Sequence, residues 1–172
     1  MIFFIIVITL TLLQRIIELF IARRNTQLLL SKGAKEFGAT HYWMLVCLHS
    51  FFFLSMAIEY AVRRPSVSNF WPVALTAFLV AQVARIWIIH SMNGRWTTRI
   101  LVLPKTPLVT EGPFRLLRHP NYLVVAIEIA VLPLVFGLYY TSAIFTVLNG
   151  LVLLGVRIPE ENRALKTYCA EL

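Results

Sequence analysis

Charged residues are scarce in this chain of 172 amino acids. Only 14% of its residues are Asp, Glu, Lys or Arg, whereas soluble domains carry about 25%. Hydrophobic residues make up 59% of the sequence, and its mean hydropathy is +0.76. One small core cannot bury so much apolar surface, which excludes an ordinary soluble domain and favours lipid as the solvent. The length allows a single domain with a few membrane spans, each of roughly 20 apolar residues.

Cysteine is nearly absent as well. The two cysteines, Cys47 in an apolar stretch and Cys169 near the C-terminus, exclude a disulfide-rich scaffold. The four histidines lack the spacing of metal ligands, so we expect no metal site. No basic residue precedes the first apolar stretch, whereas Arg23 and Arg24 follow it. This order is not that of a signal peptide, and we expect the first segment to remain as an anchor.

Apolar segments divide the chain into predicted membrane spans. The last two spans come from one apolar stretch, 122–156, which is too long for one helix and favours a tight hairpin turning near Gly137 to Thr141. We expect an all-α integral membrane protein with about five transmembrane helices, a cytoplasmic cofactor-binding loop and a short C-terminal helix, all in one domain. The predicted spans are 1–22, 42–62, 70–92, 122–137 and 140–156, followed by a helix at 158–170, with the loop at 93–121.

Lys and Arg residues lie mostly on one side of these spans. With the N-terminus outside, twelve fall on the inner side and two, Arg63 and Arg64, on the outer side. Cytoplasmic loops collect Lys and Arg, so this distribution predicts an outside N-terminus and a cytoplasmic C-terminus. The net charge of +8 then reflects topology and not a nucleic-acid partner. The inner residues are Arg23, Arg24, Lys32, Lys35, Arg95, Arg99, Lys105, Arg115, Arg118, Arg157, Arg163 and Lys166.

Two possible pairs of opposite charge lie inside the predicted spans. Arg15 and Glu18 are three residues apart and can pair on one helical face. Arg85 and Glu128 are costly in lipid, where ionisable residues normally face a bundle interior or one another. We expect Arg85 and Glu128 to form a buried pair behind a functional site. The alternative is that Arg85 extends to the interface while Glu128 faces a small polar cavity.

The segment from Asn93 to Asn121 is the one long polar stretch. It contains four prolines and two glycines before Asn121, which rules out a continuous helix. Irregular backbone at a membrane face is tolerated where it lines a cavity or is buried in protein. A plain connecting loop is the simpler reading, but long ordered loops are more often functional.

Several short motifs around this loop resemble the isoprenylcysteine carboxyl methyltransferase family. They cover roughly residues 80 to 166, and their order is that of the family. The motifs are Arg85-x-Trp87, Gly94-Arg95-Trp96-Thr97, Leu108-Val109-x-x-Gly112-Pro113-Phe114, Arg118-His119-Pro120-Asn121-Tyr122 and Arg157-Ile-Pro-Glu160-Glu161. The resemblance implies a small membrane enzyme, bacterial by its motifs, that uses S-adenosylmethionine as methyl donor. In this family the cofactor pocket lies on the cytoplasmic side, beneath the loop and the C-terminal helix.

The resemblance also implies roles for individual residues. Cofactor contacts are implied for Thr106, Pro107, Leu108, Val109, Phe114, His119, Pro120, Asn121, Tyr122 and Glu161. Glu161 would face the positive charge of the cofactor, and Arg157 would act in catalysis by binding the methyl acceptor. A guanidinium can hold an anionic oxygen with two hydrogen bonds, so transfer then depends on alignment and needs no metal. Family members commonly have His and Tyr where this chain has Thr106 and Phe114, so two polar contacts are missing.

The acceptor implied by this reading is lipidic. It is an isoprenylcysteine-type carboxylate, or the enolic or phenolic hydroxyl of a long-chain lipid. Taken singly, the motifs have plainer readings: His119-Pro120 can begin a helix, Glu160-Glu161 can favour a helix dipole, and Arg157 can anchor at the interface. Their order in one chain favours a membrane O-methyltransferase. The alternative is a non-enzymatic transporter or binding scaffold, which would favour broken or repeated spans that the sequence lacks.

Overall fold

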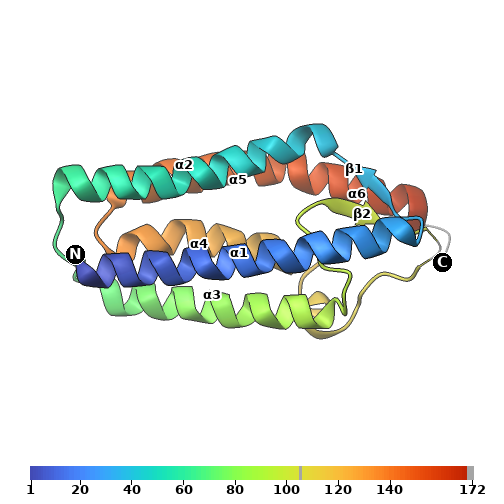
Figure 1. Cartoon of the computed structure of the whole chain (residues 1–172), viewed down its shortest axis with the longest axis horizontal. Helices are drawn as coiled ribbons and strands as arrows, with labels where there is room; N and C mark the ends of the chain where they lie inside the picture. The colour runs from blue at the N-terminus through green and yellow to red at the C-terminus, as the bar shows by residue number, and fades with distance from the viewer. Residues whose placement is uncertain (105, 170–172) are drawn as a thin grey trace.

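The computed structural model describes residues 1–104 and 106–169 and is an elongated bundle of helices (Figure 1). Most helices run along its length, and short strands lie at one end. The elements are α1 (Ile2–Ser31), β1 (Lys35–Phe37), α2 (Ala39–Arg63), α3 (Trp71–Ser91), β2 (Ile100–Val102), the 3₁₀ helix η1 (Gly112–Arg115), α4 (Pro120–Val135), α5 (Tyr139–Val152), the π-helix η2 (Leu153–Arg157) and α6 (Ile158–Cys169).

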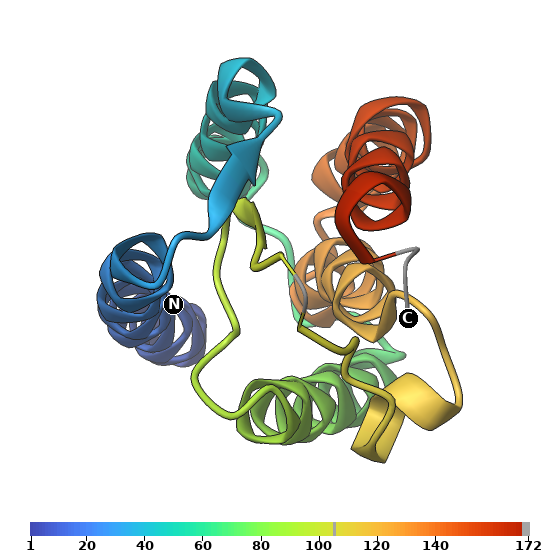
Figure 2. The same cartoon turned by 90° about the vertical axis from the view of Figure 1, so that its right-hand side faces the viewer.

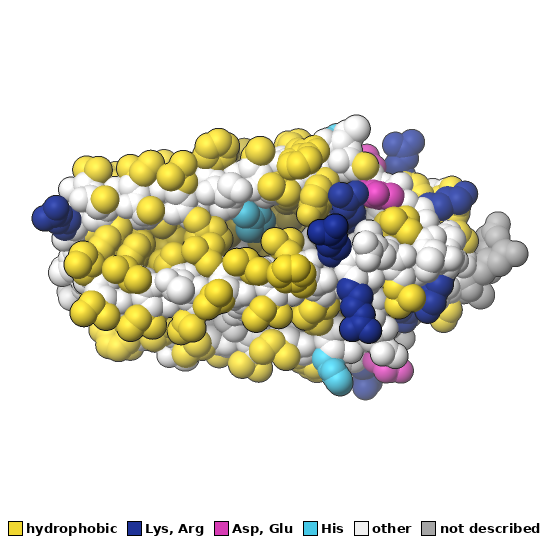
Figure 3. Space-filling model, viewed as in Figure 1, with side chains coloured by type: hydrophobic (Ala, Val, Ile, Leu, Met, Phe, Trp, Pro, Cys, Tyr) yellow, Lys and Arg dark blue, Asp and Glu magenta, His cyan; other side chains and the backbone are white. Residues whose placement is uncertain are grey.

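Four helices in the described part of the chain are long and apolar enough to cross a membrane: α1, α2, α3 and the continuous helix from Tyr139 to Tyr168. The apolar α4 is shorter. Hydrophobic side chains cover most of the surface, and Lys and Arg side chains gather toward the end that carries the strands (Figure 3). We call this the loop end, and the opposite end, where α4 turns into α5, the hairpin end. The predicted all-helical membrane fold is confirmed.

The core of the bundle lies toward the hairpin end. There α3 packs on α4, α4 on α5, and α5 on α2. In lipid, helices associate through close packing and not through a difference in hydrophobicity, so the fit of these side chains holds the bundle together. The largest buried members of this core are Leu48, Phe52, Met56, Phe78, Ile129, Leu132, Phe136, Leu138 and Phe145.

The α4–α5 turn lies at Phe136–Leu138, where the sequence predicts it. Gly137 has a φ of +67°, in the left-handed region that other residues rarely adopt. A Cβ at this position would also lie 3.2 Å from the carbonyl oxygen of Ser66. Conformation and space therefore both require glycine at this turn.

The helices differ from the predicted spans at several ends. Helix α1 continues past residue 22 to Ser31, so it extends beyond the membrane at the loop end. The predicted C-terminal helix is present as α6, and residue 170, its predicted end, lies outside the described residues. The structure also contains a small sheet that an all-helical prediction omits.

This sheet joins two distant segments at the loop end. Strand β1 pairs antiparallel with β2, with Lys35 opposite Val102 and Phe37 opposite Ile100. Ile100 and Val102 are buried together with Ala164 of α6. The pairing fastens the loop after α3 to the connection between α1 and α2, and it seats both against α6.

A network of charged side chains crosses the interior midway along the bundle. Glu128 of α4 accepts from Arg85 Nε at 2.9 Å and also from Arg85 Nη2, and it lies 2.8 Å from Arg15 Nη2. Arg15 also pairs with Glu18 at 2.5 Å. The two predicted pairs are thus confirmed, and they form one network, which the sequence did not predict. Two guanidiniums and two carboxylates balance each other, as the low-polarity surroundings require.

Helix α1 is attached to the bundle at three levels. At the hairpin end, the rings of Phe4 and Tyr60 stack at 4.0 Å. Midway, Arg15 and Glu18 belong to the charged network. At the loop end, the side-chain amide of Asn25 donates to the carbonyl of Trp96 at 2.8 Å. Between the last two levels, side chains of α1 and α2 line a cavity instead of packing together.

Candidate functional site

A cavity of about 500 Å³ extends from the loop end into the bundle. Its deep half is lined by α1, α2 and Arg85 of α3, and its outer half by the segment after α3, the start of α4 and the α5–α6 helix. Figure 2 views the bundle from the loop end, where the chain after α3 crosses the middle toward β2, with α1 on one side and α4 and α6 on the other. The volume lies within the range of small-molecule sites.

Most of the residues predicted for the site meet in this cavity. Seven of them line it: Phe114, His119, Pro120, Asn121, Tyr122, Arg157 and Glu161. They come from two separate parts of the chain, 114–122 and 157–161, which only the fold brings together. The remaining four, Thr106, Pro107, Leu108 and Val109, are not among the lining residues. The carbonyl of Pro107 accepts a hydrogen bond from Arg95 Nη1 at 2.8 Å, which places this segment at the rim. Cofactor contact by these four residues stays a prediction.

Glu161, Tyr122 and Arg157 form a chain of hydrogen bonds inside the cavity. The hydroxyl of Tyr122 donates to Glu161 Oε2 and accepts from Arg157 Nε at 3.1 Å. Arg157 Nη2 also donates to the carbonyl of Thr98 at 2.8 Å. The guanidinium is buried, with 7% of its residue exposed. These bonds fix its plane while leaving further N–H donors for a ligand, because Arg has five.

His119 lies between two residues of α6. Its Nε2 is 3.0 Å from Asn162 Oδ1, and its Nδ1 is 3.7 Å from Glu161 Oε1. The Glu161 carboxylate beside it raises the pKa of His119, and Asn162 adds to this, although partial burial acts in the opposite direction. His119 also stacks on Tyr122, with ring centroids 5.5 Å apart. The start of α4 is thereby joined to α6 across the cavity mouth.

A π-helix places Arg157. The five residues Leu153–Arg157 form this wider turn within the continuous helix, directly before α6. Pro159 explains it, because proline has no N–H to donate to the carbonyl four residues earlier, and its ring crowds that carbonyl. Widening the turn relieves the clash. Single π turns are frequent at functional sites, and this one sets the direction of Arg157 relative to α5.

The outer half of the cavity has an excess of positive charge. Arg99 is paired with Glu36 at 2.7 Å, while Arg15 and Arg85 are neutralised in the deep network. Three other lining arginines, Arg95, Arg118 and Arg157, form no salt bridge with any residue of the described ranges. Glu161 is the one carboxylate that lines this half, counted over the same ranges. Such a cavity suits a ligand set that includes an anion.

Sequence reasoning missed several lining or supporting residues. Thr98 holds Arg157 through its carbonyl, Asn162 orients His119, and Tyr42 of α2 reaches Thr98 at 3.3 Å. A contact through a backbone carbonyl does not depend on residue type, so the sequence cannot indicate the role of Thr98. Tyr42 lies in no motif that would indicate its contact with Thr98. Asn162 directly follows the Glu160-Glu161 motif, and this adjacency is the one feature of the sequence that could have suggested a role for Asn162 at the site.

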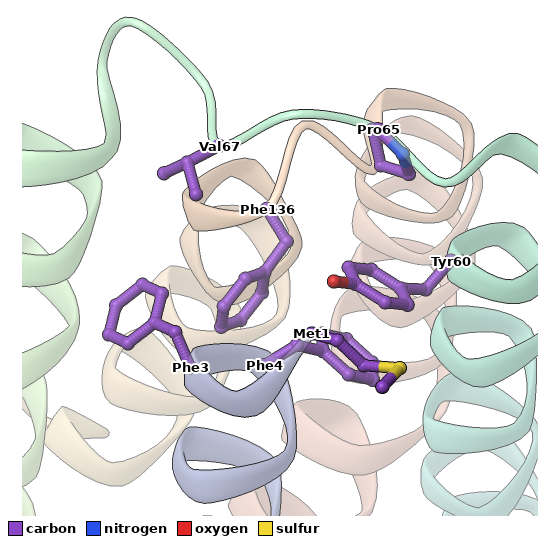
Figure 4. A pocket seen from close by; sticks show the side chains of 7 residues that line it. All are labelled: Met1, Phe3, Phe4, Tyr60, Pro65, Val67 and Phe136. Carbon is purple, nitrogen blue, oxygen red and sulfur yellow. The ribbon is translucent and has the colours of Figure 1, made fainter.

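A second cavity, at the hairpin end, is too small for such a ligand. Its volume is about 20 Å³, and Figure 4 shows its walls, made by the side chains of Met1, Phe3, Phe4, Tyr60, Pro65, Val67 and Phe136. This is room for about one water molecule. Within the described residues, no group of three His, Cys, Asp or Glu side chains could hold a metal ion. The larger cavity is therefore the candidate site.

Comparisons with known proteins match this half of the chain to a family. Residues 73–167 match the isoprenylcysteine carboxyl methyltransferase (ICMT) family. A relative in Bacillus subtilis, the uncharacterized protein YpbQ, is 38% identical over 94% of this chain and 95% of its own length. An uncharacterized protein of Haemophilus influenzae is 28% identical over 88% of each chain. No solved structure matches.

Proposed function

Because the chain belongs to the isoprenylcysteine carboxyl methyltransferase family, we propose that it is an S-adenosylmethionine-dependent O-methyltransferase of the membrane. The observation that carries the proposal is the convergence of His119, Tyr122, Arg157 and Glu161 in one cavity. Each belongs to a family motif, and the motifs are far apart in the sequence.

The outer half of the cavity is the proposed cofactor site. Glu161 supplies a carboxylate for the positively charged ammonium or sulfonium of S-adenosylmethionine. Asn121 and Tyr122 offer polar contacts, and Phe114 and Pro120 offer apolar surface for the adenine ring. Cofactor bound there supplies an activated methyl group. The role of the chain is to hold that methyl group in line with the acceptor oxygen, which is where most of the rate enhancement would arise.

The proposed acceptor is a lipid that enters from the side. Between α1 and α2 the cavity is lined by the apolar residues Leu12, Leu19, Leu45, Val46 and Phe53, a path suited to a hydrocarbon chain. Arg157 would bind the reacting oxygen as a carboxylate or as an ionised enol or phenol. A non-enzymatic transporter or scaffold would need none of these cofactor contacts.

The excess of Lys and Arg at the loop end supports a cytoplasmic position for the cavity mouth. In this orientation the N-terminus is outside and the C-terminus is inside. Water-soluble cofactor reaches the outer half of the cavity from the cytoplasm, while the lipid acceptor reaches the deep half from the bilayer. The two substrates need not share an entrance.

Cofactor binding is the direct test of this proposal. We expect the purified protein in detergent to bind S-adenosylmethionine in a calorimetric titration, and the Glu161→Gln variant to bind about 10- to 100-fold more weakly, because a buried charge-assisted contact is lost. Glu160→Gln is the matched control, since Glu160 is the neighbouring carboxylate and does not line the cavity. Absence of binding by the parent protein would exclude the methyltransferase proposal. Equal losses in both variants would exclude the specific role of Glu161.

We also expect cofactor affinity to depend on pH through His119. Its raised pKa means that the ligand-free protein keeps an imidazolium beside Glu161 to higher pH than usual. This pair stabilises the ligand-free fold below pH about 6.5, and the stabilisation is lost as pH rises through the raised pKa. An imidazolium there opposes a cationic ligand, so the dissociation constant should fall between about pH 6 and pH 8. Calorimetry across this range should show the fall in the parent protein and a flatter profile in His119→Gln.

A further inference from the structure

His49 lies in the deep half of the cavity, on α2. Its depth follows from helix geometry. Tyr42, seven residues earlier, contacts Thr98, whose carbonyl also holds Arg157. Seven residues of α-helix rise about 10 Å. Along α2, His49 therefore lies about 10 Å further from the loop end than Tyr42, which reaches the residue that holds Arg157.

The hydrogen bonding of His49 determines what it can bind. Its Nδ1 is 2.8 Å from the carbonyl oxygen of Leu45, one turn earlier in the same helix. A carbonyl only accepts, so Nδ1 carries the proton. In the neutral ring, Nε2 then presents a lone pair and accepts a hydrogen bond. No side chain of the described residues donates to it.

The charged neighbours of His49 do not fill this role. Arg15, Arg85 and Glu128 act on it electrostatically, but they are bonded to each other within the charged network. Among the described residues, the one hydrogen bond of His49 is to its own helix, so this bond does not connect α2 to another element. An ionisable side chain inside a membrane protein is costly and usually serves a function. Its position on the wall of the cavity points to a ligand.

We propose that His49 determines acceptor specificity, because its Nε2 accepts a hydrogen bond from an O–H or N–H group of the lipid acceptor. This inference rests on the proposed function. The acceptor would then carry two polar groups about 10 Å apart: the oxygen that is methylated near Arg157, and a hydrogen-bond donor near His49. Its hydrocarbon chain leaves between α1 and α2, past Leu12 and Val46. A lipid whose only polar group is the reacting one would place bare hydrocarbon against His49 and Arg15.

Nitrogen NMR tests the subsite without knowledge of the natural acceptor. The protein is labelled with ¹⁵N-histidine in phosphatidylcholine nanodiscs, and the His49 signals are assigned with His49→Gln. The probes are 1-hexadecanol, which has a hydroxyl donor, and 1-methoxyhexadecane, which has the same chain without one. We expect hexadecanol alone to shift the Nε2 signal of His49. Equal shifts with both probes, no shift with hexadecanol, or a protonated Nε2 in the free protein would overturn the proposal.

Two enzyme measurements separate this inference from the proposed function. His49→Phe should bind S-adenosylmethionine as the parent does, because His49 lies away from the cofactor residues. With a membrane lipid extract and labelled methyl donor, it should raise the apparent KM about two- to tenfold with little change in kcat, and His49→Gln should restore part of the loss. The methylated product should keep an exchangeable hydrogen, counted by mass spectrometry in deuterated solvent. An unchanged KM or a product without such a hydrogen overturns the role of His49, whereas failure of the parent to bind S-adenosylmethionine overturns the proposed function.

Discussion

Replacing Glu128 with glutamine is expected to lower the free energy of unfolding by about 3–5 kcal/mol, the usual cost of removing one partner from a buried ion pair. Glu128 accepts hydrogen bonds from Arg85 and Gln82 and forms an ion pair with Arg15, so one substitution leaves two guanidiniums with Glu18 as their one nearby carboxylate in the described network. The amide of glutamine keeps the size and one acceptor but supplies no charge. Unfolding in mixed micelles, followed by circular dichroism as the fraction of denaturing detergent rises, measures the change.

A matched control separates the buried network from ion pairs in general. Glu36→Gln removes the partner of Arg99 at the loop end, where 41% of the Arg99 side chain is exposed. Exposed pairs contribute about 0–1 kcal/mol, so this variant should be nearly as stable as the parent. Equal effects of Glu128→Gln and Glu36→Gln would contradict the assigned role of the network.

Arg157→Lys is expected to lower kcat/KM for methyl transfer into a membrane lipid extract by about 10²–10³-fold, the cost of losing one preorganised donor to a developing or bound oxyanion. Lysine keeps the charge but carries its three donors on one nitrogen, so it loses the plane in which Arg157 bonds Tyr122 and Thr98 through separate nitrogens and presents others to an acceptor oxygen. Transfer of labelled methyl groups from S-adenosylmethionine measures the loss. Affinity for the cofactor should change far less, because Glu161 remains.

The control for this substitution lies in the same cavity. Arg99 also lines it but has its own partner in Glu36 and stacks over the ring of Tyr42 at 4.9 Å. Arg99→Lys should therefore retain most of the activity. Equal losses of activity in Arg99→Lys and Arg157→Lys would show that methyl transfer does not depend on the planar guanidinium geometry of Arg157 in particular.

The membrane fold could be predicted from the sequence because lipid imposes simple rules. Long apolar segments must be helices, and the 35-residue run 122–156 had to fold back, which it does at Gly137. The sheet was not predicted, because β1 is a three-residue segment, Lys35–Phe37, with no strand pattern of its own. Its pairing with Ile100–Val102 depends on a long-range register that local patterns do not encode.

The candidate site was predictable to the extent that motifs mark it. His119 to Tyr122 and Glu161 line one cavity, but only the fold shows that they come together. Spacing suggested the Arg15–Glu18 pair, and cost in lipid suggested Arg85–Glu128. The two pairs join into one network because α1 lies against α3 and α4, and local sequence patterns do not specify which helices pack together. The side-chain chemistry of His49 was likewise visible only once its bond to Leu45 was known.

The uninterrupted helix from Tyr139 to Tyr168 carries a mechanical consequence. Thirty residues of helix are about 45 Å long, whereas the hydrocarbon of a bilayer is about 30 Å thick. Arg157 and Glu161 thus belong to the same continuous helix as the span α5, with the π turn and Pro159 but no loop at the junction. A change in bilayer thickness is met in part by tilting or bending of such a helix, which would strain the bonds that join Arg157 and Glu161 to Tyr122 of α4. The rate of the proposed methyl transfer should therefore vary with the acyl-chain length of the host lipid.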